Sequence, residues 1–381
     1  MTMCAYVRVV EFPLRRIFRF LRNYSIEVLC LVLWVASMIE IALNPSNTAS
    51  LEHFYTDHMR EEWTAWCFLQ LGYKIFYTPV KYLVHQCHSL YPHPFWGNVP
   101  TDRPLGCIFI FLPFGILANL GILPDVLVHR LEIAIITTQA IGAIYLIARA
   151  VRNRFVRVMF LTFLAPYILH WSLNGIYDGA ILLFVIVGLL AYERKRWKLS
   201  ALALTYAVCT HYRAVMYTPL VLGSIVNLWR SGDRRTAIKL GAVCLIAIIV
   251  CTLIPAYLTF VKAEHVLTRV ATGKAGGGFG NFKKLLNKLI LYYTFFGVGF
   301  AYFIYRRRIA HAFSLLGGAL IIWLIFNQLW HAILVFIPWI VVDEVFFAFM
   351  MPIAFMFGVG SYLPWTLYWF LKNYGINPRL D

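Results

Sequence analysis

The sequence predicts an all-α polytopic membrane protein. Of its 381 residues, 61% are hydrophobic and only 13% are charged, whereas charged residues make up about a quarter of a typical soluble domain. The mean hydropathy is +0.71. The net charge of +17 comes from short Lys and Arg clusters between apolar runs, not from one basic face. We therefore expect membrane lipids as partners and no nucleic acid.

Apolar runs of roughly 17 to 25 residues are the predicted membrane spans, because that length crosses a bilayer. In chain order they are 25–43, 131–149, 155–173, 177–192, 199–215, 214–229, 236–261, 288–305, 309–327 and 330–371. The last run is long enough for two crossings. We expect the first run to stay as an anchor, because no clear small-residue cleavage site ends it. This gives a bundle of about 10–12 transmembrane helices.

Five basic clusters predict the orientation of these spans, because Lys and Arg favour the cytoplasmic side. They are Arg8 to Arg22, Arg149 to Arg157, Arg194 to Lys198, Arg230 to Arg235, and Arg306 to Arg308. Consecutive clusters need an even number of crossings between them. We therefore expect residues 105–122, which Pro113 and Gly115 interrupt, to be re-entrant or surface-lying. Several polar stretches then share the non-cytoplasmic face: the 44–104 loop, Asn174–Asp178, His211–Arg213, the 262–288 loop and Asn327–His331.

Ionisable residues gather directly after the first span. If Asp57 begins a helix, Asp57, Arg60 and Glu61 share one face at i, i+3 and i+4, and Glu62 lies with His58 on a neighbouring stripe. Such a helix fits the membrane surface, with its aromatic residues toward lipid or core and its acids toward a water-filled cavity. A solvated helix with ordinary ion pairs is the alternative.

Neither the cysteines of the chain nor the histidines of the first loop predict a metal site. None of the eight cysteines forms a Cys-x-x-Cys pair, and most lie in apolar runs, where a free Cys acts as a small hydrophobe. Pairing of Cys67 with Cys87 outside the membrane is the minor alternative. His85, His88 and His93 have a spacing that could mimic a zinc site, but prolines interrupt it and no acids lie nearby. We expect neither a metal nor a cofactor.

The order of motifs between residues 25 and 230 resembles the GT-C glycosyltransferases, in particular mannosyltransferases that use a polyprenyl-phosphate sugar. No single motif is specific, and their order carries the resemblance. In this chain they are Asp57, Leu69–Gly72 and Tyr77–Pro79; Pro104–Gly106 and Leu112–Gly115; Tyr177–Asp178; and His211–Arg213 before Tyr217–Pro219. The chain departs from relatives with one isolated acid, because Glu61 and Glu62 follow Asp57 closely.

The resemblance implies a GT-C-like bundle in three parts: a cytoplasmic basic N-terminus, 1–24; a catalytic module, 25–230, which includes the outer loop 44–104; and C-terminal helices, 231–381, which complete the donor cavity. It implies an inverting transfer of a hexose or pentose, first of all mannose, from a polyprenyl monophosphate carrier. The acceptor would be a lipid-linked or cell-envelope glycan. The expected location is the non-cytoplasmic side of a bacterial or archaeal cytoplasmic membrane.

This chemistry needs a carboxylate to take the acceptor proton and cationic groups to stabilise the leaving phosphate. The resemblance makes Asp57 the first candidate base and leaves Glu61 as the second; a helix N-cap is the simpler role for Asp57. The candidates for donor phosphate binding are Arg213, His211, Lys274 and His331, and those for acceptor binding are Arg60, Glu62 and Asp178. Some of these candidates have a simpler alternative. Arg213 could snorkel to the membrane surface, and His331 could be an ordinary interfacial histidine. Asp178 could cap a helix, and the loop around Lys274 could merely link two helices.

Two other classes stay open. In an O-antigen ligase or polymerase, outer Arg and His residues carry catalysis in place of a first-loop Asp. If the protein were a lipid or solute transporter, we would expect inverted repeats and broken central helices. The sequence does not show them.

Overall fold

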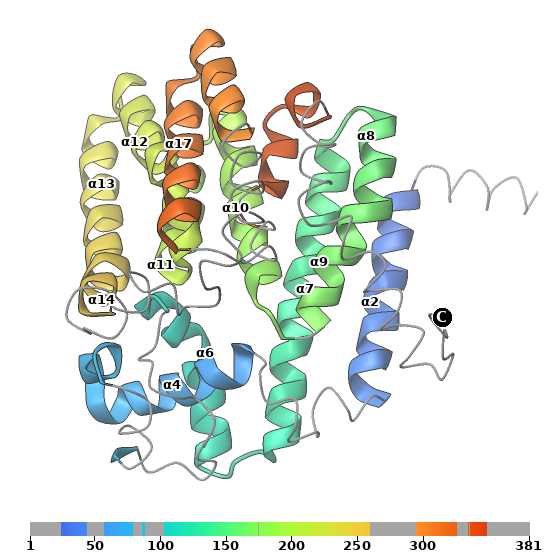
Figure 1. Cartoon of the computed structure of the whole chain (residues 1–381), viewed down its shortest axis with the longest axis vertical. Coiled ribbons are helices and arrows are strands. Elements are labelled where there is room, and N and C mark those ends of the chain that lie inside the picture. Colours follow the sequence, from blue (N-terminus) through green and yellow to red (C-terminus); the bar gives the residue numbers. More distant parts are fainter. Residues whose placement is uncertain are drawn as a thin grey trace, which may run out of the picture.

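The protein is helical throughout the part that the computed structural model describes (Figure 1). The described residues are 24–43, 57–78, 86–87, 103–173, 175–259, 295–325, 334 and 336–348. Within these ranges there is no β-strand. The prediction of an all-α fold is confirmed for them.

The helices form an upright bundle above one helix that lies across it (Figure 1). Their bounds are α2 Ser25–Leu43, α4 Asp57–Leu71, α6 Leu105–Asn119, α7 Asp125–Ala150, α8 Arg154–Met159, α9 Ala165–Leu173, α10 Asp178–Glu193, α11 Trp197–Thr210, α12 Thr218–Arg230, α13 Arg234–Ile248, α14 Ile254–Tyr257 and α17 Ile309–Ile325. Neighbours in the bundle are α2 with α7, α7 with α9 and α10, and α10 with α11. The row continues through α12 to α13, while α4 packs on α6.

Four described helices are long and apolar enough to cross a membrane. They are Ser25–Leu43, Val126–Ala150, Arg154–Leu173 and Arg234–Tyr257. The last two are continuous rods in which a π-helical turn joins α8 to α9 and α13 to α14. Their bounds agree closely with the expected spans 155–173 and 236–261. The total of about 10–12 spans stays a prediction.

Helix α6 is too short to cross a bilayer upright. Its 15 residues rise about 22 Å at 1.5 Å per residue, less than the roughly 30 Å of a hydrocarbon core. Pro113 lies inside the helix without ending it. Helices α10, α11 and α12 have only 16, 14 and 13 residues. Length therefore does not distinguish α6 from them, and the expectation that 105–122 does not fully cross stays a prediction.

The chain between α11 and α12 differs from the expected pair of spans at 199–215 and 214–229. Helix α11 ends at Thr210, because His211 has an extended backbone with φ −149° and ψ 125°. A 3₁₀ turn, η4 (Tyr212–Tyr217), follows, and Pro219 stands at the start of α12. Proline favours the first turn of a helix, where no N–H is needed. The expected span 199–215 thus runs past the true helix end, and this break carries His211 and Arg213.

Helix α4 begins at Asp57, so the condition posed in the sequence analysis is met, and it lies across the lower part of the bundle in Figure 1. It can approach α6 closely because residue 115 is glycine: a Cβ there would lie 2.8 Å from the carbonyl oxygen of Glu62. Trp63 of α4 is also buried. The helix is therefore fixed to the bundle and is not a loosely attached surface element.

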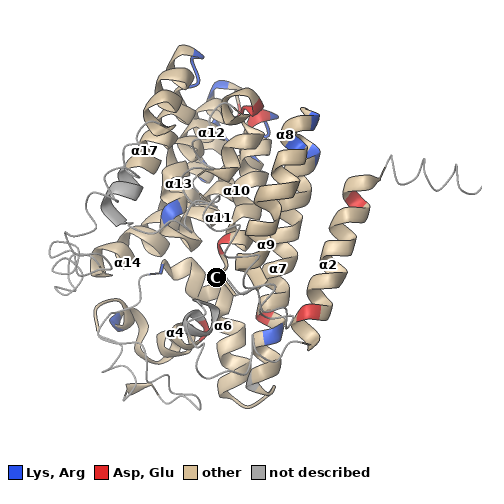
Figure 2. Ribbon diagram, turned by 45° about the vertical axis from the view of Figure 1, so that its right-hand side comes forward, with Lys and Arg blue, Asp and Glu red and all other residues tan. Residues whose placement is uncertain are grey.

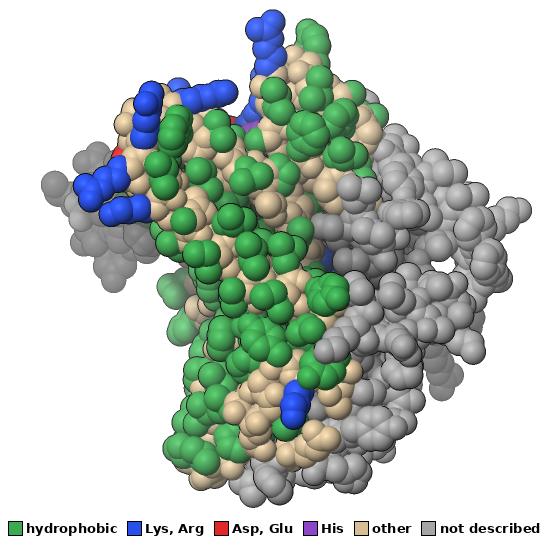
Figure 3. Space-filling model, turned by 90° about the vertical axis from the view of Figure 1, so that its left-hand side faces the viewer, with side chains coloured by type: hydrophobic (Ala, Val, Ile, Leu, Met, Phe, Trp, Pro, Cys, Tyr) green, Lys and Arg blue, Asp and Glu red, His purple; other side chains and the backbone are tan. Residues whose placement is uncertain are grey.

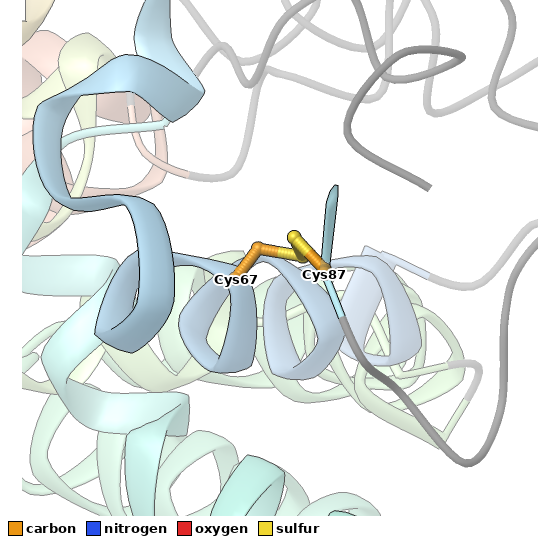
Figure 4. The surroundings of a disulfide bond; sticks show 2 residues. All are labelled: Cys67 and Cys87. Atoms are coloured by element: carbon orange, nitrogen blue, oxygen red, sulfur yellow. A yellow bond between two sulfur atoms is a disulfide. The ribbon is translucent and has the colours of Figure 1, made fainter. Parts of the chain in front are cut away.

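A disulfide joins Cys67 of α4 to Cys87, with their Cα atoms 5.4 Å apart (Figure 4). The pairing that the sequence left as the minor alternative is therefore formed, and these two residues are not free thiols. The other described cysteines form no disulfide, and most are buried as small hydrophobes: Cys30, Cys107, Cys209, Cys244 and Cys251. The bond ties the segment after α4 back onto that helix.

Hydrophobic side chains cover the outside of the bundle. Figure 3 shows them in green over the face that carries α13, with Lys and Arg mostly at its upper end. On this helix Val243, Leu245 and Ile246 are each more than half exposed. Water would not tolerate so large an apolar surface, whereas lipid would.

The described basic clusters gather at one end of the bundle. Figure 2 shows Lys and Arg in blue at the upper ends of α8, α12 and α17. Two ion pairs connect neighbouring helices there: Lys198 lies 2.9 Å from Asp233, and Arg308 pairs with Glu193. The carboxylate of Glu344 also accepts hydrogen bonds from the backbone N–H groups of Arg152 and Asn153, each at 2.6 Å. The helices are thus oriented as the spacing of the clusters predicts.

Candidate functional site

A buried ionic cluster joins α10 to the break between α11 and α12. Oδ2 of Asp178 lies 2.5 Å from Nη1 of Arg213, and Oδ1 lies 2.9 Å from Nε2 of His211. The three residues are 1%, 4% and 2% exposed, respectively. We call these three residues the aspartate cluster.

Local backbone geometry positions each member. Asp178 is the first residue of α10, and His211 is the extended residue that ends α11. The backbone N–H of Arg213 donates to Nδ1 of His211 at 3.1 Å. Since Nδ1 accepts, the proton of a neutral imidazole is on Nε2, where it can be donated to Asp178.

An aromatic residue connects a second arginine to this cluster. The Tyr177 ring centroid lies 5.4 Å from that of His211, and the Arg103 guanidinium lies 5.2 Å from the Tyr177 centroid. The hydroxyl of Tyr177 donates to the carbonyl oxygen of Thr210 at 3.4 Å. Arg103 is only 7% exposed. Among the described residues this region therefore holds two guanidinium groups and one carboxylate.

This arrangement suits an anionic ligand. Buried ionic groups are costly unless their charges are compensated, and here Asp178 compensates Arg213, with the Arg103 guanidinium close by. Arginine binds phosphate through several N–H groups in a fixed plane. The cluster can thus hold a phosphate oxygen chemically, and Asp178 keeps Arg213 and His211 in place for it.

The structure brings together three of the residues that the sequence marked, although it assigned them to different ligands. Asp178 was expected at the acceptor, and His211 and Arg213 at the donor phosphate; all three are in contact. Asp57, Arg60 and Glu61 lie in the first part of α4, and their side chains are outside the described part of the chain. Lys274 and His331 are also outside the described residues.

Glu62 belongs to a second buried cluster, which includes two residues that the sequence analysis did not mark. Oε2 of Glu62 lies 3.1 Å from Nδ1 of His129, and Oε2 of Glu132 lies 3.5 Å from the same nitrogen. All three residues are at most 4% exposed. We call them the glutamate cluster. A signal for it was present: Glu132 is an acid in an apolar run with His129 three residues before it, on the same helix face.

Helix α6 connects the two clusters. A Cβ at Gly106 would lie 2.4 Å from the carbonyl oxygen of Cys209, beside the aspartate cluster, and Gly115 touches Glu62. The two glycines are separated by about 14 Å of helix rise. The clusters are thus separate sites packed on one short helix.

Comparison of the chain with protein-family models, with curated proteins and with solved structures finds no match.

Proposed function

We propose that the protein is an integral-membrane glycosyltransferase that takes a sugar, mannose first of all, from a polyprenyl monophosphate. The acceptor is a lipid-linked or cell-envelope glycan. One observation carries the proposal: the aspartate cluster, with Arg103 beside it, places two buried guanidinium groups inside a bundle covered by apolar side chains. A phosphate on a lipid chain matches both properties.

In the proposed reaction, a carboxylate removes the proton of the acceptor hydroxyl, the new C–O bond forms, and the bond from the sugar to phosphate breaks on the opposite side. Asp57 is the proposed base. Arg213 and Arg103 stabilise the charge on the departing phosphate, and His211, whose Nε2–H points to Asp178, helps to hold that carboxylate in place. Asp178 orients Arg213 and His211, a role that replaces its expected contact with the acceptor.

The proposed site faces the non-cytoplasmic side. Asp178 is the first residue of α10. Glu193 is the last residue of this helix, and it pairs with the basic residue Arg308. The aspartate cluster therefore lies toward the end of the bundle opposite to the gathered basic clusters, which favour the cytoplasm.

A single-turnover assay with purified protein in lipid discs and polyprenyl-phosphate mannose tests the base. Asp57→Asn keeps the size and capping ability of the side chain but cannot accept a proton. We expect unchanged donor binding and transfer at least about a hundredfold slower, the usual scale for a positioned base. The matched control is Asp233→Asn, which removes a surface carboxylate at the other end of the bundle and should leave the rate unchanged.

Near-normal transfer by Asp57→Asn with strong loss in Glu61→Gln would move the base to Glu61. Absence of transfer from every polyprenyl monophosphate sugar by folded wild-type protein would contradict the proposal.

The second candidate is an enzyme of the O-antigen ligase or polymerase type. The observation that favours it is the identity of the buried groups, because His211 and Arg213 are the residue types that carry catalysis in that class. It predicts transfer from a polyprenyl diphosphate-linked glycan. It also predicts that His211→Ala and Arg213→Ala abolish transfer while Asp57→Asn does not.

A further inference from the structure

The glutamate cluster is formed by two helices that are far apart in sequence. Glu62 comes from α4, whereas His129 and Glu132 stand one turn apart in α7. One possible ligand atom from each residue lies within 4.8 Å of those of the other two. The cluster does not share a residue with the aspartate cluster, and the inference drawn from it does not rest on the proposed transfer reaction.

The cluster brings two carboxylates and one imidazole together, and their side chains are almost completely buried. Oε2 of Glu62 accepts no hydrogen bond from the described residues, although it lies 3.1 Å from Nδ1 of His129. Buried carboxylates are normally paired or bound to a metal. A divalent cation would take up the lone pair of this oxygen.

The spacing fits a coordination shell. Zinc binds His nitrogen and Glu oxygen at about 2.0–2.2 Å in a tetrahedral arrangement, so neighbouring ligand atoms lie about 3.4 Å apart. The distances from Nδ1 of His129 to the two glutamate oxygens are 3.1 and 3.5 Å. The two glutamate oxygens lie within 4.8 Å of each other, so the three donor atoms could surround one cation after the side chains move closer together.

The donor set also selects the kind of cation. Mg²⁺ and Ca²⁺ prefer oxygen ligands alone, whereas imidazole suits zinc and other transition metals. Two carboxylates keep the site hard enough for Mn²⁺ as well. We propose that Glu62, His129 and Glu132 bind one Zn²⁺ or Mn²⁺ ion. Three protein ligands leave a coordination position for water or a ligand group, as in catalytic zinc sites.

Close packing of α4 prepares the site. The contact between Gly115 and the carbonyl oxygen of Glu62 brings this part of α4 against α6, and α4 also packs against α7. The metal would thus tie the first outer segment of the chain to the foot of α7.

The test uses full-length protein in lipid discs, stripped with EDTA and then equilibrated with Zn²⁺ or Mn²⁺. Elemental analysis should give one tightly bound ion per chain, and the unfolding temperature should rise with the concentration of that ion, because it binds only the folded state. In Glu132→Gln we expect affinity to fall at least about 100-fold, because loss of even an outer-shell partner costs 10–100-fold.

Glu193→Gln is the matched control, because Glu193 also pairs with a histidine, His311, but no second acid is paired with that histidine in the described residues. It should keep the bound ion. Folded wild-type protein that binds neither ion, or equal affinity in wild type and Glu132→Gln, would overturn the proposal.

X-ray absorption on the zinc-loaded wild type needs no variant. It should show only nitrogen and oxygen neighbours; a sulfur neighbour would place the ion elsewhere and overturn the assignment.

Discussion

At the scale of single residues, two ion pairs of this chain differ in burial. The side chains of Arg213 and Asp178 are at most 5% exposed, whereas those of Arg149 and Glu27 are 54% and 32% exposed. Removal of one partner from a buried pair leaves a charge without compensation and costs about 3–5 kcal/mol. We expect Arg213→Ala to lower the free energy of unfolding by that amount, and Arg149→Ala by no more than about 1 kcal/mol.

Unfolding in a denaturing detergent series measures both variants. Asp178→Asn should restore part of the loss in the Arg213→Ala background, because the buried negative charge is then gone. Equal effects of the two single variants would mean that the buried pair contributes no more than the exposed one.

A second residue-scale prediction concerns phosphate binding. Lysine keeps the charge of Arg213 but loses the planar set of N–H donors. Arg213→Lys should therefore fold normally and reduce transfer at least about tenfold, the usual effect of losing one good charge-assisted hydrogen bond. Single-turnover rates and donor-binding isotherms for the same protein preparation check this. Unchanged values in both measurements would assign Arg213 to a purely structural role.

At the scale of elements, glycines set how closely helices approach. Gly115 lies against the backbone of α4, so its replacement by alanine would require a helix to move. We expect Gly115→Ala to destabilise the protein by about 1–3 kcal/mol, as overpacked cores do, and to weaken metal binding at the glutamate cluster.

Gly142→Ala is its control. The nearest atom to a Cβ at residue 142 is a Leu183 side-chain carbon at 3.5 Å, an ordinary contact, and alanine favours a helix interior by roughly 0.5–1 kcal/mol over glycine. The control should be neutral or stabilising. A stable Gly115→Ala variant with normal metal affinity would show that α4 can shift without consequence.

The disulfide of α4 makes a further prediction at this scale. Cys67 and Cys87 are 20 residues apart, and closing a loop of that length stabilises a fold by about 3 kcal/mol in the chain-entropy account. Cys67→Ser should lower the unfolding free energy by about that much, whereas Cys251→Ser, at a free and half-buried thiol, should change it little.

Alkylation before and after reduction, read by mass spectrometry, tests the bond directly. Modification of Cys67 and Cys87 without a reductant would contradict it. Since disulfides persist in oxidising compartments, an intact bond also supports an outer location for α4.

At the scale of the whole molecule, the distribution of charge predicts the topology. The described basic clusters gather at one end of an apolar bundle (Figure 2), and α4 lies across the lower part of it. We expect an impermeant maleimide to label Asp57→Cys in intact cells, and to label Arg196→Cys and Arg307→Cys only after permeabilisation. A protected position 57 together with a labelled position 196 would reverse the orientation.

The sequence by itself determined the helical class, most helix bounds and the relative direction of the helices. Apolar runs and basic clusters are local properties, and a chain can satisfy its backbone hydrogen bonds in lipid within each helix. A helix start at Asp57 was a condition of the sequence argument, and α4 begins there. Because the basic clusters predict the direction of each helix, the sequence could also indicate that Asp178, His211 and Arg213 lie toward one end of the bundle.

Only the tertiary structure decided which side chains meet. The sequence assigned Asp178 and Arg213 to different ligands, because helix periodicity gives no distance between α10 and the end of α11; the extended backbone of His211 brings them into contact. The same holds for Glu62 with His129 and Glu132, and for the Cys67–Cys87 bond. Such contacts depend on how closely helices pack, and here two glycines of α6 set that distance.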